Sequence, residues 1–287
     1  MKFKKTLGIL AVSAIMAFSA FGCTGSDTSA AGGNAEGMTA EDRVKAANEK
    51  MAEVTSMDSN MKMEMDMSAG EQAVSTVTDM DITYFMDPLK MKINMTMDMG
   101  ELGSQSMEMY ADVVDDVYTM YVNDGTQWLS QEIPAEALGA YDTKEAMMSY
   151  LGDPSAYTEV GTEDIDGVSA VKLEGKLSGD ELKEAVESSG SLDSLSSLGL
   201  DSATISGLYE DLGEVPIYVW LDAETNYPVK YEMDMTAVMQ KLMDNIMAAA
   251  PEAANAEASI SFTKFKMSMT CSNFNEATDF EIPAEAK

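Results

Sequence analysis

The stretch MKMEMDM, at residues 61–67, decides the fold of this chain, because methionines alternate with charged residues along its whole length. Successive side chains of a β-strand point to opposite faces, so every methionine of the stretch would lie on one face. Such strict alternation is typical of an antiparallel strand with one face against a core and the other in water. The stretch therefore predicts a long, half-buried strand.

The same alternation recurs along much of the chain. It is visible in residues 80–86, 91–99, 107–109, 229–235 and 265–271. Between such stretches, NDG at residues 123–125 and DG at residues 166–167 are typical of tight hairpin turns. We therefore expect about ten to twelve antiparallel strands, spread over most of the chain.

Helical periodicity interrupts the strand pattern and flanks it. After Thr39, a good N-cap residue, Val44, Ala47 and Met51 recur at helical spacing and predict a first helix with one apolar side. Further helices are predicted near residues 134–151 and 179–187, shortly before residue 212, and over residues 236–250. Because the strand pattern is continuous, residues 39–287 are predicted to form a single domain.

The first residues have the pattern of an export signal. Residues 1–5 (MKFKK) are basic, residues 6–21 are largely apolar, and Gly22 and Cys23 follow. This order predicts a signal peptide over residues 1–22, and residues 23–38 as a lipidated cysteine with a flexible tether. The apolar run is too short and too early for a transmembrane span. We expect a lipid-anchored protein on the extracytoplasmic face of the bacterial cell membrane; an ordinary cleaved signal with a coincidental cysteine is the alternative.

Composition excludes several classes of function. The formal net charge is −32, and such an acidic chain repels nucleic acid, which we exclude as a partner. The chain has no histidine, which excludes a Ser-His-Asp triad, a Cys-His pair and His-ligated zinc. Cys271 lies in an alternating stretch and is predicted to be a small buried residue, not a nucleophile. We therefore predict no catalytic residue, no cofactor and no metal site, and expect a protein that is not an enzyme.

The 27 methionines allow three interpretations. The first is that they only pack the core, since this flexible side chain fills irregular gaps. The second is that they line a cavity for a hydrophobic molecule, because methionine adapts to varied ligands. The third is soft-metal binding, because thioethers select Cu(I). Within one strand, however, the sulfurs of an M-x-M pair lie about 6–7 Å apart, so several strands would have to converge. The residues predicted to line the hydrophobic cavity are Met61, Met63, Met65, Met95, Met97, Met107, Met109, Met233, Met235, Met267 and Met269.

Two passages near the C-terminus resemble a known family. They are VPIYVWLDAETNYPVK at residues 215–230, and NFNE at residues 273–276 with FEIPAEA at residues 280–286. They resemble a family of uncharacterised Gram-positive lipoproteins that is related in fold to the LolA and LppX/LprG lipoprotein carriers. The resemblance covers residues 38–287 and implies an α+β fold, a strongly curved, open antiparallel half-barrel with helices packed over its concave face. It also implies an apolar cavity between sheet and helices, and no catalytic residues, because these relatives are carriers or binders.

The combined expectation is a membrane-anchored lipoprotein that binds or carries a hydrophobic molecule, such as a lipid or an acyl chain. The alternative is a non-catalytic interaction or sensor module, with a filled core and another envelope protein as its partner. A Cu(I)-binding, methionine-rich protein is a minor alternative. An enclosed methionine-lined cavity would favour the first function, and a filled core with an exposed apolar patch would favour the second.

Overall fold

A computed structural model of the chain describes residues 37–70, 72–86, 88–114, 117–123, 125–133, 148, 151–177, 207–208, 212–249 and 260–287. The predicted signal peptide, Cys23 and the tether up to residue 36 lie outside the described residues. So do most of the helix predicted near residues 134–151 and all of the one predicted at residues 179–187.

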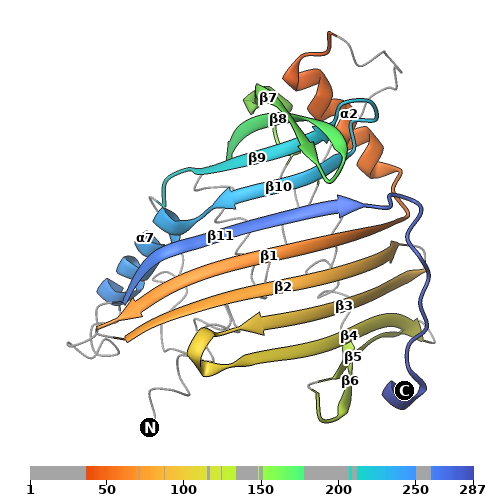
Figure 1. The fold of residues 1–287 in the computed structure, drawn as a ribbon, viewed down its shortest axis with the longest axis vertical. Helices are drawn as coiled ribbons and strands as arrows, with labels where there is room; N and C mark the ends of the chain where they lie inside the picture. Colours follow the sequence, from red (N-terminus) through yellow and green to blue (C-terminus); the bar gives the residue numbers. More distant parts are fainter. Residues whose placement is uncertain are drawn as a thin grey trace.

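The described residues form eleven strands, which join in one open antiparallel sheet (Figure 1). The architecture is the open, curved α+β half-barrel that the family resemblance implies. The strands are β1 (Ser56–Ala69), β2 (Gln72–Met86), β3 (Leu89–Asp98), β4 (Ser104–Val114), β5 (Val117–Asn123), β6 (Trp128–Ile133), β7 (Thr158–Ile165), β8 (Val168–Leu177), β9 (Val215–Asp222), β10 (Pro228–Asp234) and β11 (Ile260–Ser272).

Two meanders make up this sheet. The strand order is β6-β5-β4-β3-β2-β1-β11-β10-β9-β8-β7, so β1–β6 form one meander and β7–β11 form the other. They meet where β1, the first strand, pairs with β11, the last, along almost their whole lengths. The centre of the sheet therefore joins the two ends of the domain, and β6 and β7 are its edges (Figure 1).

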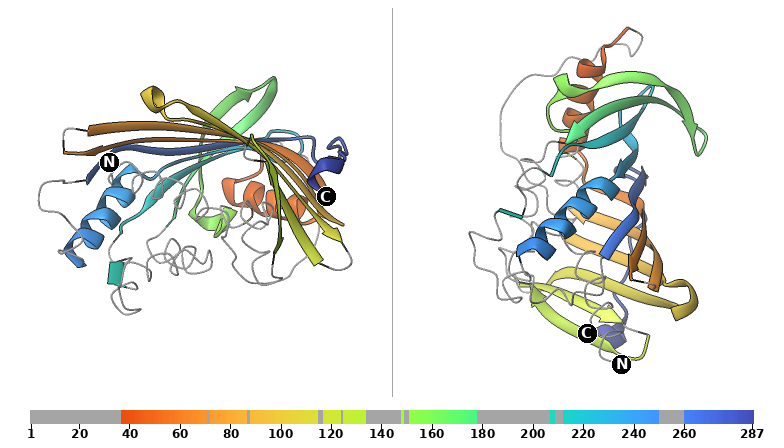
Figure 2. Two further views of the ribbon diagram at one scale, coloured as in Figure 1. Left: turned by 90° about the horizontal axis from the view of Figure 1, so that it is seen from below. Right: turned by 90° about the vertical axis from the view of Figure 1, so that its left-hand side faces the viewer.

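The register places the alternating methionines on one face. Met61 of β1 lies opposite Met269 of β11 and Met80 of β2, and all three are buried or half-buried. Lys62, the next residue of β1, points to the other face and is exposed. The sheet curves around the methionine side, which we call the concave face; the opposite side is the outer face (Figure 2).

Helix α2 (Ala40–Ala52) lies on the concave side of the sheet (Figure 2). It begins with a capping box, in which the Asp42 N–H donates to Thr39 Oγ1 at 3.1 Å and the Thr39 N–H donates to Asp42 Oδ2 at 3.2 Å. Val44, Ala47 and Met51 are completely buried, as their helical spacing predicts. The helix therefore covers one part of the apolar face of the sheet.

Helix α7 (Thr236–Ala249) lies on the same side and is attached to β11 (Figure 2). The Phe265 N–H donates to Thr236 Oγ1 at 2.9 Å, and the Phe262 N–H donates to Gln240 Oε1 at 2.7 Å. The register of β11 shifts between these two donors, which is the mark of a bulge. Within the described part of the chain, neither α2 nor α7 has the length and hydrophobicity to span a membrane.

Three short 3-10 helices complete the described elements: η1 (Gly100–Leu102), η3 (Pro154–Ala156) and η4 (Ala284–Ala286). The last of them belongs to residues 273–287, which we call the C-terminal strap. Phe280 of the strap packs on the outer face against Phe85 and Tyr110, with ring centroids 6.1 and 5.7 Å apart. Lys90 Nζ donates to the Phe280 carbonyl oxygen, and η4 contacts β5 and β6. The strap thus ties the β2–β6 region together from outside.

Candidate functional site

The concave face is the candidate site because strand after strand directs apolar side chains toward it. Along the described residues of β1–β6, the register puts no charged residue on this face. The charged residues of these strands lie on the outer face instead; examples are Lys62, Glu64, Asp79, Lys92 and Glu108. A molecule on the concave side of these strands would meet an uncharged surface.

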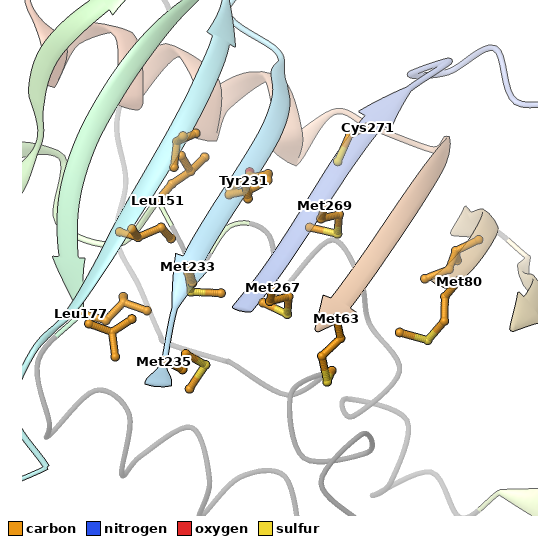
Figure 3. Packing of buried hydrophobic residues seen from close by; sticks show 14 of the residues in the cluster. Met63, Met80, Leu151, Leu177, Tyr231, Met233, Met235, Met267, Met269 and Cys271 are labelled. Atoms are coloured by element: carbon orange, nitrogen blue, oxygen red, sulfur yellow. The ribbon is translucent and has the colours of Figure 1, made fainter. Parts of the chain in front are cut away.

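The concave side chains of β8–β11 are deeply buried, and we call this part the closed half. On β9, Val215, Ile217 and Val219 have no exposed surface, and neither has Leu173 of β8. They form one cluster with residues of α2 and α7, among them Val238. Figure 3 shows the labelled side chains of this region projecting to one side of the strands. The closed half is therefore packed core.

Side chains in the closed half pack so closely that one position of β8, Gly175, has room only for a glycine. Gly175 of β8 lies opposite Ile217, and the ring of the buried Tyr157 packs directly on it. A Cβ atom at Gly175 would lie 2.6 Å from Tyr157 Cε1, nearer than two such atoms can approach. The close approach of Tyr157 leaves no space for a ligand at this point.

The concave side chains of β3–β6 are less covered, and we call this part the open half. Most of its apolar side chains are half-buried, and Leu129 on the edge strand β6 is 55% exposed. The half-buried residues are Leu89, Ile93, Met95, Met107, Met109, Val113, Tyr118, Met120 and Val122. The open half is thus an accessible apolar surface that continues from the closed half across β1 and β2.

The structure brings the methionines of the predicted cavity to one face. They fall into two groups, which differ in how much of each side chain is exposed. The buried ones are Met63, Met65, Met97, Met233, Met235, Met267 and Met269. The half-buried ones are Met61, Met95, Met107 and Met109. Met235 lies between β10 and α7 and packs into the same cluster as the closed half. Only the half-buried group offers surface to a ligand. The predicted lipidation site, Cys23, lies outside the described residues.

Sequence reasoning missed part of the concave face. Met80 is buried on the concave face between Met61 and Met95, and Met120 and Val122 of β5 extend the surface toward the edge. The signal for β5 was present in VYTMYVN at residues 117–123, which alternates like the other strands. The alternation within a strand does not show which residues of the neighbouring strand lie opposite it, and this register determines which side chains are neighbours on the face.

Five methionines form a continuous row across the concave face. The register pairs Met107 with Met95, Met95 with Met80, Met80 with Met61, and Met61 with Met269. We call these five residues the methionine row. Residues directly opposite each other in an antiparallel sheet have Cβ atoms about 4.5–5.5 Å apart, which brings neighbouring side chains of the row into contact. Figure 3 shows two of its members, Met80 and Met269, projecting to the same side of the sheet.

Few polar groups interrupt the concave face. Ser59 is buried opposite Ile82 and Cys271, and its Oγ has no hydrogen-bond partner in the described residues. Burial raises the pKa of the Cys271 thiol far above its ordinary value, because the thiolate would be desolvated. The thiol therefore stays protonated and inaccessible. Cys271 is a small buried residue, as its alternating stretch predicts, and its thiol does not have the exposure of a nucleophile.

The outer face is polar and held together by ion pairs. Lys264 Nζ lies 2.8 Å from Glu64 Oε1, and this hydrogen bond lowers the pKa of that carboxyl group. Trp220 is buried between Lys172 and Lys230, whose Nζ atoms each lie 4.6 Å from its ring centroid. This tryptophan is a packing anchor. Among the described residues, no group of acidic or cysteine side chains is arranged to hold a metal ion.

The chain belongs to DUF6612, a family of unknown function, which matches residues 39–287. No curated protein matches the chain. Similar solved structures include LprF from Mycobacterium bovis, with 14% identity, coverage of 86% of this chain and 97% of LprF, and a TM-score of 0.48. The lipoprotein LppX from Mycobacterium tuberculosis has 14% identity, coverage of 84% and 98%, and a TM-score of 0.43. A LolA-superfamily protein from Nitrosomonas europaea has 10% identity, coverage of 85% and 96%, and a TM-score of 0.23. These are the groups that the sequence resemblance indicated.

Proposed function

We propose that this member of the family binds or carries a hydrophobic molecule, a lipid or an acyl chain, on the open half of its concave face. The observation that supports this function most directly is the contrast in burial across one continuous apolar surface. Ile217 in the closed half is completely buried, whereas Met107 and Met109 in the open half are half-buried. Contiguous exposed apolar surface on a soluble domain marks a place where something binds.

The chemistry of the open half fits the acyl part of a lipid. Its concave positions carry no charge in the described strands, so a charged headgroup would find no partner among them. Methionine side chains have three rotatable bonds and a polarizable sulfur, and they adapt to ligands of different shape. The face therefore suits a family of related chains better than one rigid molecule.

Binding of a fluorescent fatty acid tests this proposal. Met107→Asp would put a carboxylate on the concave side of β4, and we expect the folded variant to lose most of its probe binding. Ser106→Asp is the matched control, because the neighbouring residue of the same strand is exposed on the outer face. Binding that is equal in both variants, or absent from the unaltered chain, would contradict the proposal.

The proposed site of action is the extracytoplasmic face of the bacterial membrane, with Cys23 as the lipidated anchor. The basic, apolar and small residues that precede Cys23 support this proposal. We expect Cys23→Ser to release the protein from washed membranes or to leave it unprocessed, since stable anchoring needs the acyl chains. Equal membrane retention of both forms after a high-salt wash would contradict the anchor.

The function we propose is non-catalytic. The absence of histidine from the sequence and the protonated, buried thiol of Cys271 both support binding rather than catalysis. The second candidate is an interaction or sensor module, which the combination of a packed closed half and an accessible apolar surface on the open half also favours. Native mass spectrometry of the purified chain separates the two, because a carrier is expected to retain lipid and an interaction module is not.

A further inference from the structure

We propose that the methionine row binds a soft monovalent metal ion, Cu(I), through the thioether sulfurs of Met80, Met95 and Met107. This inference goes beyond hydrophobic ligand binding and does not depend on it. It rests on the register of β2, β3 and β4, which places the three methionines directly opposite one another.

The spacing of the three side chains suits a shared ion. Neighbouring strands lie about 4.8 Å apart, so the outer two of three adjacent strands are about 10 Å apart at the backbone. A methionine side chain is long and flexible enough for the outer two sulfurs to lean over the middle one. The sheet curves toward this face (Figure 2). On the inner side of a curved sheet, side chains of neighbouring strands can approach each other more closely than the strands that carry them. The sulfurs of one M-x-M stretch are too far apart to share an ion, but methionines that lie opposite each other on adjacent strands can bring their sulfurs together.

The surroundings favour a soft monovalent ion over a hard divalent one. Thioether sulfur is a soft, neutral ligand that selects Cu(I), whereas Mg²⁺ and Ca²⁺ need oxygen ligands. No charged residue occupies the concave positions of β2, β3 or β4 in their described residues, so the site offers no carboxylate. The net charge of −32 on the whole chain attracts cations of any kind toward the protein. Selectivity would therefore come from the sulfurs alone.

Access distinguishes this part of the row from the buried methionines of the closed half. Met95 and Met107 are half-buried, and Met80 is 8% exposed. A second run of opposed methionines, Met63 with Met267 and Met267 with Met233, is buried in the closed half and at its border. An ion from solvent can reach Met95 and Met107 directly, and Met80, which belongs to the buried cluster, lies directly opposite Met95.

Two methionines on the same strands provide a matched control. Met97 of β3 lies opposite Thr78 and Gln105, and Met109 of β4 lies opposite Ile93 and Val122. Neither has a methionine directly across from it on either side. The double variant Met97→Leu/Met109→Leu therefore removes two thioethers from the face without breaking the row.

The test is metal titration of the full chain in mild detergent. Cu(I) is added without oxygen against the chelator bicinchoninate, and Ag(I) serves as a probe of similar softness that does not change oxidation state. We expect one equivalent to bind to the unaltered chain and to Met97→Leu/Met109→Leu, and stoichiometric binding to disappear in Met80→Leu/Met95→Leu. Equal binding by the two double variants, or no binding by the unaltered chain, would overturn the proposal.

Two further measurements keep the result interpretable. Leucine keeps the surface apolar at similar volume, so any change in fatty-acid binding should be the same in the two double variants, whereas only Met80→Leu/Met95→Leu should lose the metal ion. The metal titration therefore tests the Cu(I) site, and fatty-acid binding tests the hydrophobic function, so that either proposal can be contradicted without the other. If Met80→Leu/Met95→Leu does not fold, methyl NMR of the unaltered chain decides. Ag(I) should shift the methionine methyl signals of the row, and a uniform shift of all methionines would overturn the site.

Discussion

Strand β9 and strand β4 carry apolar side chains toward the same concave face, yet they differ in what covers them. Ile217 and Val219 on β9 have no exposed surface, because α2 and α7 pack over their side of the sheet. Met107 and Met109 on β4 keep part of their surface exposed. Alternation along a strand thus determines which side chains share a face, but the helices determine whether that face becomes core or accessible surface.

The outer face supports both halves of the sheet. Behind the open half, the C-terminal strap packs Phe280 and Ala286 against Tyr110 and Tyr121. Behind the closed half, a second cluster surrounds Trp220. In the described residues, the two halves therefore differ in how their concave face is covered and not in whether their outer face is packed. The outer packing supports the strands of the open half while part of their concave side stays accessible.

The largest expected difference between the halves follows the introduction of a charge. We expect Ile217→Asp to prevent folding or to cost about 4 kcal/mol or more, because a carboxylate would be buried without a partner. Met107→Asp should cost about 1 kcal/mol, since a half-buried side chain can turn its carboxylate toward water. Urea unfolding measures both. Similar losses at the two positions would show that the open half is packed core as well.

A smaller difference should follow the removal of side-chain volume. Met269 in the closed half is 2% exposed, and Met269→Ala is expected to cost about 2–5 kcal/mol through lost contacts and the cavity left behind. Met109→Ala should cost about 1 kcal/mol, because part of that side chain is already in water. Thermal melting of the two variants ranks them. A larger loss at Met109 would reverse the assignment of the halves.

Loss of the strap contact should affect one half only. Phe280→Ala removes the ring that packs on Phe85 and Tyr110, at an expected cost of about 1–3 kcal/mol for a partly buried aromatic side chain. Hydrogen exchange of backbone amides should then accelerate in β3–β5 and stay unchanged in β8–β10. Glu281→Ala, at the exposed neighbouring residue, is the control. Uniform acceleration would mean that the two halves open as one unit.

The smallest effect concerns pH. Burial raises the pKa of Tyr110 to about 12, and the hydrogen bond that its hydroxyl donates to Glu108 adds to the rise. Because the folded state holds this proton more tightly than the unfolded state, the stabilisation is complete below about pH 10 and is lost as the pH rises toward 12. Between pH 9 and pH 11 we expect the free energy of unfolding to fall less in Tyr110→Phe than in the unaltered chain, by at most about 1 kcal/mol. Urea unfolding at pH 9 and pH 11 measures it, and an unchanged loss in the variant would assign it to other groups.

Much of the fold was predictable from single strands, and much of the site was not. The alternation in residues 61–67 and 265–271 predicted that Met63 and Met267 face the core, and the structure pairs them directly. That Met80 lies between Met61 and Met95 depends on the offsets of three strands, which no single strand encodes. The difference between Ile217 and Met107 depends on where the helices lie. The strap sequence carried a family resemblance but no signal that it packs on the outer face.

The pairing of the first strand with the last has a consequence for how the chain folds. Each meander forms from neighbours in sequence, whereas β1 and β11 come together only after the residues between them have been synthesised. Closing so long a loop costs entropy before any contact forms, and such non-local pairing slows folding. We therefore expect the two meanders to form early and their junction to be rate-limiting. Until residues 260–272 are available, β1 has an unpaired edge that is open to aggregation or to binding by a chaperone.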